Sequence, residues 1–74
     1  MIKELDTIVL AVDLPEHHLK QGDIGTVVLV HRNPQGYEVE FISLTGKTVA
    51  LLFLFPSQIR LVQECEIPHV RLVA

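Results

Sequence analysis

The apolar positions of the chain fall into five short runs that are separated by turn-forming residues. We predict a strand from each run, because the runs are short, rich in β-branched or aromatic residues and bounded by Gly, Pro or Asn. The predicted strands cover residues 7–12, 25–31, 37–43, 48–55 and 59–62. Pro56 holds the backbone angle that a helix start requires, so residues 56–58 are predicted to form one helical turn before the last strand.

The connections between these runs favour one architecture. Residues 32–36 (RNPQG) and 44–47 (LTGK) carry the Asn-Pro and Gly signals of hairpin turns. Residues 13–23 hold two turn formers and six charged or His residues, and are predicted to form a long loop. This order of elements predicts an all-β protein, a small five-stranded SH3-like barrel with a one-turn helix before the last strand. An open five-stranded sheet capped by a C-terminal helix is the alternative.

At 74 residues the chain holds one domain. We assign residues 1–62 to the barrel and residues 63–74 to a C-terminal tail that packs on the barrel or on a partner. Pro68 disfavours helical geometry at Ile67, so a short helix or an added strand is possible only from Pro68 onward.

The run VALLFLFP at residues 49–56 is apolar at every position. Side chains alternate along a strand, so both faces of this strand are predicted to be apolar. One face is expected to carry Val49, Leu51, Phe53 and Phe55, and the other Ala50, Leu52 and Leu54. The first two predicted strands are also apolar on both faces, with Val27 and Leu29 expected on the same face of the second.

A barrel has one interior, so the second apolar face needs a cover that this short chain cannot supply with helices. The tail offers Ile67, Val70, Leu72 and Val73, fewer apolar side chains than the outer faces present. An exposed apolar patch beyond a few hundred Å² marks an interaction site. We therefore predict a protein-binding module that associates through the outer face of residues 48–55 and the tail, as a homodimer or with a separate protein.

The residues predicted to form this interface are Leu52, Phe53, Leu54, Phe55, Ile67, Val70 and Leu72. If Phe53 and Phe55 point outward, they are the anchors. If they point inward, Leu52 and Leu54 take that role and the interface is flatter.

Composition narrows the function further. The net charge is −3 and the basic residues are scattered, whereas nucleic-acid modules of this size usually carry a basic surplus, so no nucleic-acid partner is expected. No segment approaches the ~18 consecutive apolar residues of a membrane span. A lone cysteine, Cys65, and a start without an export signal favour the cytoplasm.

No catalytic residue, cofactor, metal or small-molecule substrate is predicted, and the chain is expected not to be an enzyme. Cys65 and His69 lie four residues apart, but Pro68 between them argues against an aligned catalytic pair. Glu38 and Glu40 alternate with apolar residues and are interpreted as the solvent face of the third strand.

His17 and His18 are the tempting metal ligands, with Asp13 in the same loop. Neighbouring side chains in an extended loop point apart, and no second His or Cys pair follows at ligand spacing. Solvated loop histidines are therefore expected, and a metal-binding protein that uses this loop is kept as an alternative.

Three stretches carry a family resemblance: DLPE at residues 13–16, GDIGTV at 22–27 and VEF at 39–41. With the family-like tail EIPHVRLVA, they make the chain, from about residue 2 to residue 62, similar to an uncharacterised bacterial family, domain of unknown function 4926. The resemblance implies an SH3-like barrel, no assigned activity and small accessory genes beside toxin-like neighbours. An antitoxin or immunity-type accessory protein is therefore one form of the predicted module.

The chain departs from this family at the end of the fourth predicted strand, residues 48–55. The resemblance leads us to expect polar or acidic residues there, and this chain has Phe53 and Phe55.

A second resemblance supports another alternative. GDIGTVV, residues 22–28, resembles the glycine-centred hairpin of KOW modules, which bind RNA or a polymerase. It implies an RNA- or ribosome-associated module. The competing interpretation is that Gly22 and Gly25 supply turn conformations that other residues resist.

Overall fold

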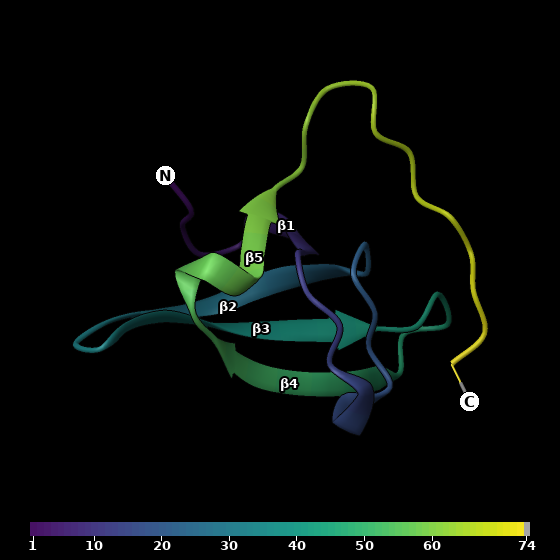
Figure 1. Ribbon diagram of the computed structural model, residues 1–74, viewed down its shortest axis with the longest axis horizontal. Coiled ribbons are helices and arrows are strands. Elements are labelled where there is room, and N and C mark those ends of the chain that lie inside the picture. The colour runs from purple at the N-terminus through teal and green to yellow at the C-terminus, as the bar shows by residue number, and fades with distance from the viewer. Residues whose placement is uncertain (74) are drawn as a thin grey trace.

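The computed structural model describes residues 1–73, which contain five strands and two short helical turns (Figure 1). The strands are β1 (Thr7–Leu10), β2 (Ile24–Arg32), β3 (Gln35–Ile42), β4 (Thr48–Leu54) and β5 (Ile59–Leu61). The 3₁₀ turn η2 (Pro56–Gln58) precedes β5 as predicted, and a second 3₁₀ turn, η1 (Pro15–His17), lies in the long loop after β1.

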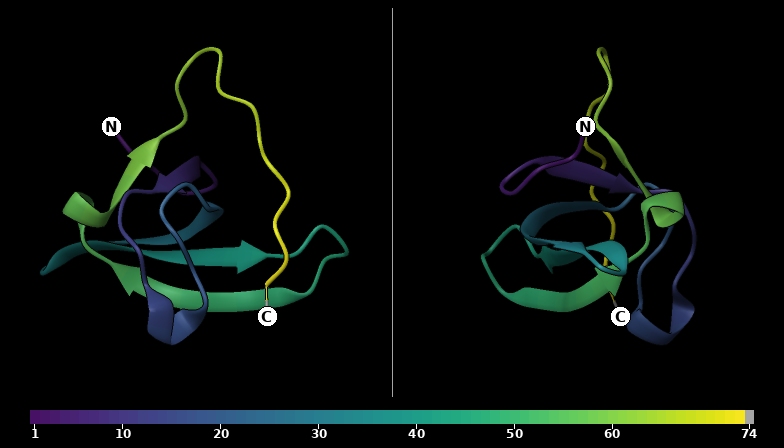
Figure 2. Two further views of the ribbon diagram at one scale, coloured as in Figure 1. Left: turned by 45° about the vertical axis from the view of Figure 1, so that its right-hand side comes forward. Right: turned by 90° about the vertical axis from the view of Figure 1, so that its left-hand side faces the viewer.

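The strands form one antiparallel sheet in the order β4-β3-β2-β1-β5, and the views in Figure 2 show that it curls strongly around one face. The all-β prediction is confirmed. Within residues 1–73 no ladder joins β4 to β5, so the sheet is open rather than closed into the predicted barrel. The seam is occupied by η2, where the carbonyl of Gln58 accepts a hydrogen bond from the N–H of Ala11 at 2.7 Å.

The concave face of the sheet holds the hydrophobic core. Four of its side chains are fully buried: Ile8, Leu10, Val27 and Val39. The remaining core members are Leu19, Tyr37, Phe41, Leu54 and Ile59. Leu19 comes from the long loop after β1, so this loop is tied to the core through an apolar side chain as well as through its ends.

In β3 the alternation follows the sequence prediction. Tyr37, Val39 and Phe41 are buried, while Glu38 and Glu40 lie on the convex face. Directly paired residues share a face of a sheet. Because Val39 pairs with Leu52 and Glu38 pairs with Phe53, this register decides which side of β4 faces the core.

In β2 the predicted alternation is wrong. The register with β3 shifts between Val27 and Leu29, so Val28 is the extra residue of a β-bulge. Val27 is fully buried, and Leu29, which was expected on the same face, is on the convex face and 42% exposed. Beyond a bulge, the residues that point to each face of the sheet are exchanged. A strict two-residue alternation therefore does not hold along the whole of β2.

The structure corrects the predicted connection between the second and third strands. The β2–β3 turn consists of Asn33 and Pro34 alone, and Gly36, predicted to close a five-residue turn, is buried within β3. Gly25 lies in β2, as the predicted strand 25–31 required, and does not supply a turn conformation; a Cβ atom there would lie 2.6 Å from the side chain of Val39. Gly22 does have the left-handed φ of a turn, at 99°.

The tail leaves β5, arches away from the sheet and returns toward the long loop (Figures 1 and 2). Residues 62–73 form neither helix nor strand, so neither the capping helix of the alternative fold nor an added strand is found among the described residues.

Candidate protein-interaction surface

The convex face of β2, β3 and β4 carries a group of exposed apolar side chains. Leu29 pairs with Glu38, and Glu38 pairs with Phe53, so the three form a row across the strands. We call Leu29, Leu51, Phe53 and Phe55 the outer patch; their exposed fractions are 42%, 55%, 39% and 51%. Solvent therefore reaches large apolar groups on the side of the sheet opposite the core.

Phe53 lies at the centre of the outer patch. Its ring meets that of Phe55 edge-on at a centroid distance of 5.2 Å, and that of His31 at 5.4 Å. It also covers Gly36, where a Cβ atom would lie 2.1 Å from the ring. The lack of a side chain at Gly36 thus lets the end of the Phe53 ring approach β3 closely.

The polar groups within this face have partners in the chain itself. His31 Nε2 lies 2.7 Å from Glu38 Oε2, and the Thr48 hydroxyl donates to Glu40 Oε2 at 2.7 Å. Glu38 and Glu40 are half-buried on the convex face, as the sequence predicted. Carboxylates that already accept hydrogen bonds are less costly to desolvate than free ones.

The predicted interface residues of β4 divide between the two faces. Phe53 and Phe55 are exposed, which is the outward alternative. Leu54 is 3% exposed and belongs to the core, and Leu52 is partly buried against it. Of these four predicted residues, the exposed ones are therefore the two phenylalanines, and Leu51 and Leu29, which the bulge brings outward, are exposed beside them.

β4, which carries Leu51 and Phe53 of the outer patch, is also an edge of the sheet. Edge strands normally carry charges, prolines or very short lengths that prevent pairing with other chains. β5, the opposite edge, is three residues long and contains Arg60. β4 is seven residues long and has no charged residue, Gly or Pro.

The tail residues predicted to join the interface are even more exposed. The exposed fractions of Ile67, Val70 and Leu72 are 87%, 74% and 91%. They do not cover the outer patch. The tail is instead attached to the long loop, where Arg71 and Leu72 line a groove of about 380 Å³ with loop residues that include Pro15 and Leu19.

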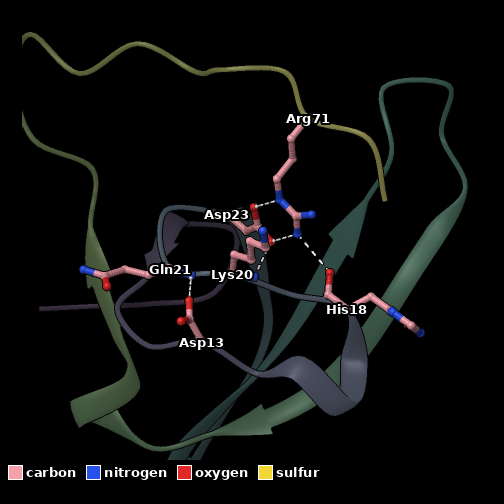
Figure 3. Close-up of polar contacts among 6 residues, drawn as sticks. All are labelled: Asp13, His18, Lys20, Gln21, Asp23 and Arg71. Atoms are coloured by element: carbon pink, nitrogen blue, oxygen red, sulfur yellow. Dashed lines mark hydrogen bonds and ion pairs between the residues drawn. The ribbon is translucent and has the colours of Figure 1, made fainter. Parts of the chain in front are cut away.

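Arg71 makes the attachment (Figure 3). Its Nε donates to Asp23 Oδ1 at 2.8 Å, a terminal nitrogen donates to the other oxygen of Asp23, and the same nitrogen donates to the carbonyl of His18 at 2.9 Å. Partial burial opposes ionisation of Asp23, but hydrogen bonds from Arg71 and from the Lys20 N–H outweigh it and lower the pKa of the carboxyl group. The positions are 48 residues apart, and no pattern in the sequence signalled this pair.

A second ion pair holds the start of the tail. Arg60 donates to both oxygens of Glu66 at 2.9 and 2.7 Å, and the Gln63 N–H donates to the same carboxylate at 2.7 Å. The hydrogen bonds from Arg60, with that from Gln63, lower the pKa of Glu66 to about 2. The tail is thus fixed at its root by Glu66 and near its end by Arg71.

The histidine loop does not gather ligands. Across residues 1–73 no three His, Cys, Asp or Glu side chains lie so that they could hold a metal ion. His17 lines a small groove of about 170 Å³ between η1 and β4. His18 directs its backbone carbonyl, and not its ring, toward Arg71 (Figure 3). Cys65 is exposed in the turn at the tail root.

Within the described part of the chain, no helix has the length and apolarity needed to cross a membrane. Searches of curated proteins and of solved structures found no match. One family model does match, over residues 4–61, and its description is "Domain of unknown function (DUF4926)". Since the match spans most of the chain and includes all five strands, the chain belongs to the DUF4926 family.

Proposed function

We propose that this chain is a non-enzymatic, SH3-like protein-binding module that associates through the outer patch and the tail, with itself or with a separate protein. The observation that carries the proposal is the exposed cluster of Leu51 and Phe53, on an uncharged edge strand, with Phe55, which directly follows that strand. The strand order and the long first loop support the SH3-like assignment. The lone cysteine supports a place in the cytoplasm.

The outer patch has the features of an interface centre. Interface energy concentrates in a few large side chains, above all aromatic ones, that are surrounded by groups able to exclude water. Phe53 and Phe55 are such side chains, and their neighbours His31 and Glu38 are already paired. An antitoxin or immunity-type role is one biological form of this module, in which the covering partner is a neighbouring protein.

The test is to measure the association state of the chain and of a Phe53→Ala/Phe55→Ala variant. We expect sedimentation velocity of the purified chain, or native mass measurement of the complex recovered from its own cells, to show an assembly. Loss of two central aromatic side chains should weaken that assembly by roughly 30-fold or more, as loss of interface hot spots does.

Leu61→Ala is the matched control, because Leu61 has the same exposed fraction as Phe53, 39%, and lies on the opposite edge strand. It should leave the association unchanged. A single chain in both measurements, or equal weakening by the control, would show that the outer patch is not an interface.

A further inference from the structure

β4 is one of the two edges of an open sheet (Figure 1). We infer that it pairs with β4 of a second copy, edge to edge and antiparallel, so that the two sheets join into one. This pairing rests on the proposed function and deepens it, because it names a second copy as the partner and a backbone ladder as the contact.

The outward side of β4 has no backbone partner within residues 1–73. Alternate residues of an antiparallel strand direct their N–H and C=O groups to opposite sides. β3 takes up one side of β4, and no other hydrogen bond of the described chain involves the backbone of residues 48–54. The remaining donors and acceptors are the groups to which a further strand binds when it extends a sheet.

The regular part of this edge is residues 50–54. The register of these residues with β3 is continuous, and it shifts beyond Ala50, so Val49 is the extra residue of a second bulge. Bulges at sheet edges end strand pairing. The partner strand is therefore expected beside residues 50–54, with a two-fold axis at their middle residue, Leu52.

The exposed side chains of the edge suit pairing with themselves. With the axis at Leu52, Leu51 of each copy lies opposite Phe53 of the other, on the face that solvent reaches in the single chain. Large apolar side chains that lie opposite one another shield each other from water, whereas like charges in such positions repel. Since β4 contains no charged residue, self-pairing brings no like charges together within the strand.

Charged residues near the two ends of β4 complement each other across this axis. Lys47 comes directly before β4, and Glu16 lines the groove of about 170 Å³ between η1 and the C-terminal half of the strand. Both residues are exposed, and neither belongs to an ion pair in the described part of the chain.

Antiparallel pairing brings the start of one strand to the end of the other. Lys47 of each copy therefore approaches Glu16 of the other copy, at both ends of the new ladder. An isologous contact of this kind repeats every favourable pair twice. This charge complementarity favours a second copy over an unrelated strand as the occupant of the edge.

Sedimentation equilibrium of charge variants tests the pairing at its ends. Lys47→Glu and Glu16→Lys should each weaken the dimer by roughly tenfold, since two exposed ion pairs become two repulsions. The double variant Lys47→Glu/Glu16→Lys should restore the dimer. Glu4→Lys is the matched control, because it reverses an exposed carboxylate before β1, away from β4, and should change nothing. A double variant that dimerises no better than the single ones would contradict the inference.

A lysine in the middle of the edge tests the ladder itself. Leu51→Lys should weaken the dimer by about 30-fold or more, because each ammonium group would be buried against Phe53 of the other copy. Leu61→Lys, which adds the same charge on the opposite edge strand, is the control and should leave the dimer intact. Equal effects of the two lysines would overturn the inference.

Amide hydrogen exchange of the unmodified chain separates this inference from the proposed function without any variant. In the dimer, the amides of residues 50–54 that β3 leaves without a partner should become protected, which packing of the outer patch alone would not produce. An assembly without this protection refutes the edge pairing, and the proposed function still stands if Phe53→Ala/Phe55→Ala weakens that assembly. A chain that stays monomeric to about 1 mM also refutes the pairing, whatever separate protein it binds.

Discussion

The two faces of β4 are equally apolar in sequence and differ completely in their surroundings. Leu52 and Leu54 face the core, whereas Leu51 and Phe53, their immediate neighbours along the chain, face solvent. The inner face is explained by folding alone, because its burial stabilises the domain. The outer face keeps Leu51 and Phe53 partly exposed in the isolated chain, and this exposure is the basis of the association proposed above. Hydrophobicity in a strand therefore has to be judged face by face.

The largest expected effect is on the free energy of unfolding, and it differs between the two faces of β4. Leu54→Ala should lower the free energy of unfolding by about 2–5 kcal/mol, since it removes buried methyl groups and leaves a cavity. Leu51→Ala, three positions away on the exposed side, should change it by no more than about 0.5 kcal/mol. Urea denaturation of both variants measures the contrast. Equal losses would mean that the outer face also stabilises the monomer.

Alanine substitutions at Gly25, which lies against the core, and at Gly36, which lies under Phe53, compare the same two faces with smaller expected losses of stability. In Gly25→Ala the new Cβ atom meets the buried side chain of Val39 and the backbone of Glu40, which cannot move away. We expect a loss of about 1–3 kcal/mol, the usual range for overpacking. In Gly36→Ala the three atoms nearest to the new Cβ all belong to the outer end of the Phe53 ring, which can turn toward solvent, so the loss should be smaller.

Gly36→Ala should nevertheless displace the centre of the outer patch. Its signature is a change in the ring-current shifts of His31 and Phe55 in NMR spectra, which report the edge-on contacts with Phe53. Addition of Phe53→Ala should recover the lost stability. A Gly36→Ala variant less stable than Gly25→Ala would mean that the outer face is packed as rigidly as the core.

The smallest expected effect concerns Glu66, which is paired with Arg60 at the root of the tail. The folded-state pKa of about 2 lies below the ordinary value of 4.5, so the ionised form is favoured by folding. Its contribution to stability is present above about pH 4.5 and is lost as the pH falls toward 2. The urea midpoint of the unmodified chain should exceed that of Glu66→Gln at pH 6, and the two should converge near pH 2. A difference that does not vary with pH would exclude the ion pair with Arg60 as its source.

Much of the fold could be predicted from local patterns. The five runs, the helical turn at Pro56 and the alternation in β3 were correct because each depends on residues next to one another. The predicted alternation in β2 is wrong from Val28 onward. A bulge depends on how the strand pairs with its partner, and the valines around Val28 give no local signal of it. The prediction of Gly36 as a turn residue is wrong because Gly36 makes room for the ring of Phe53. Phe53 lies in β4, which begins 12 residues later, so the residues around Gly36 do not indicate this role.

The sequence by itself determined that this is a small all-β domain with more apolar surface than one interior can hold, because strand propensity and composition are local properties. Only the tertiary structure decided which side of β4 is covered, since the register with β3 places Leu54 in the core and Phe53 outside. The same holds for the tail. Its apolar side chains were visible in the sequence, but its anchor, Arg71 on Asp23, joins positions 48 residues apart that only folding brings together.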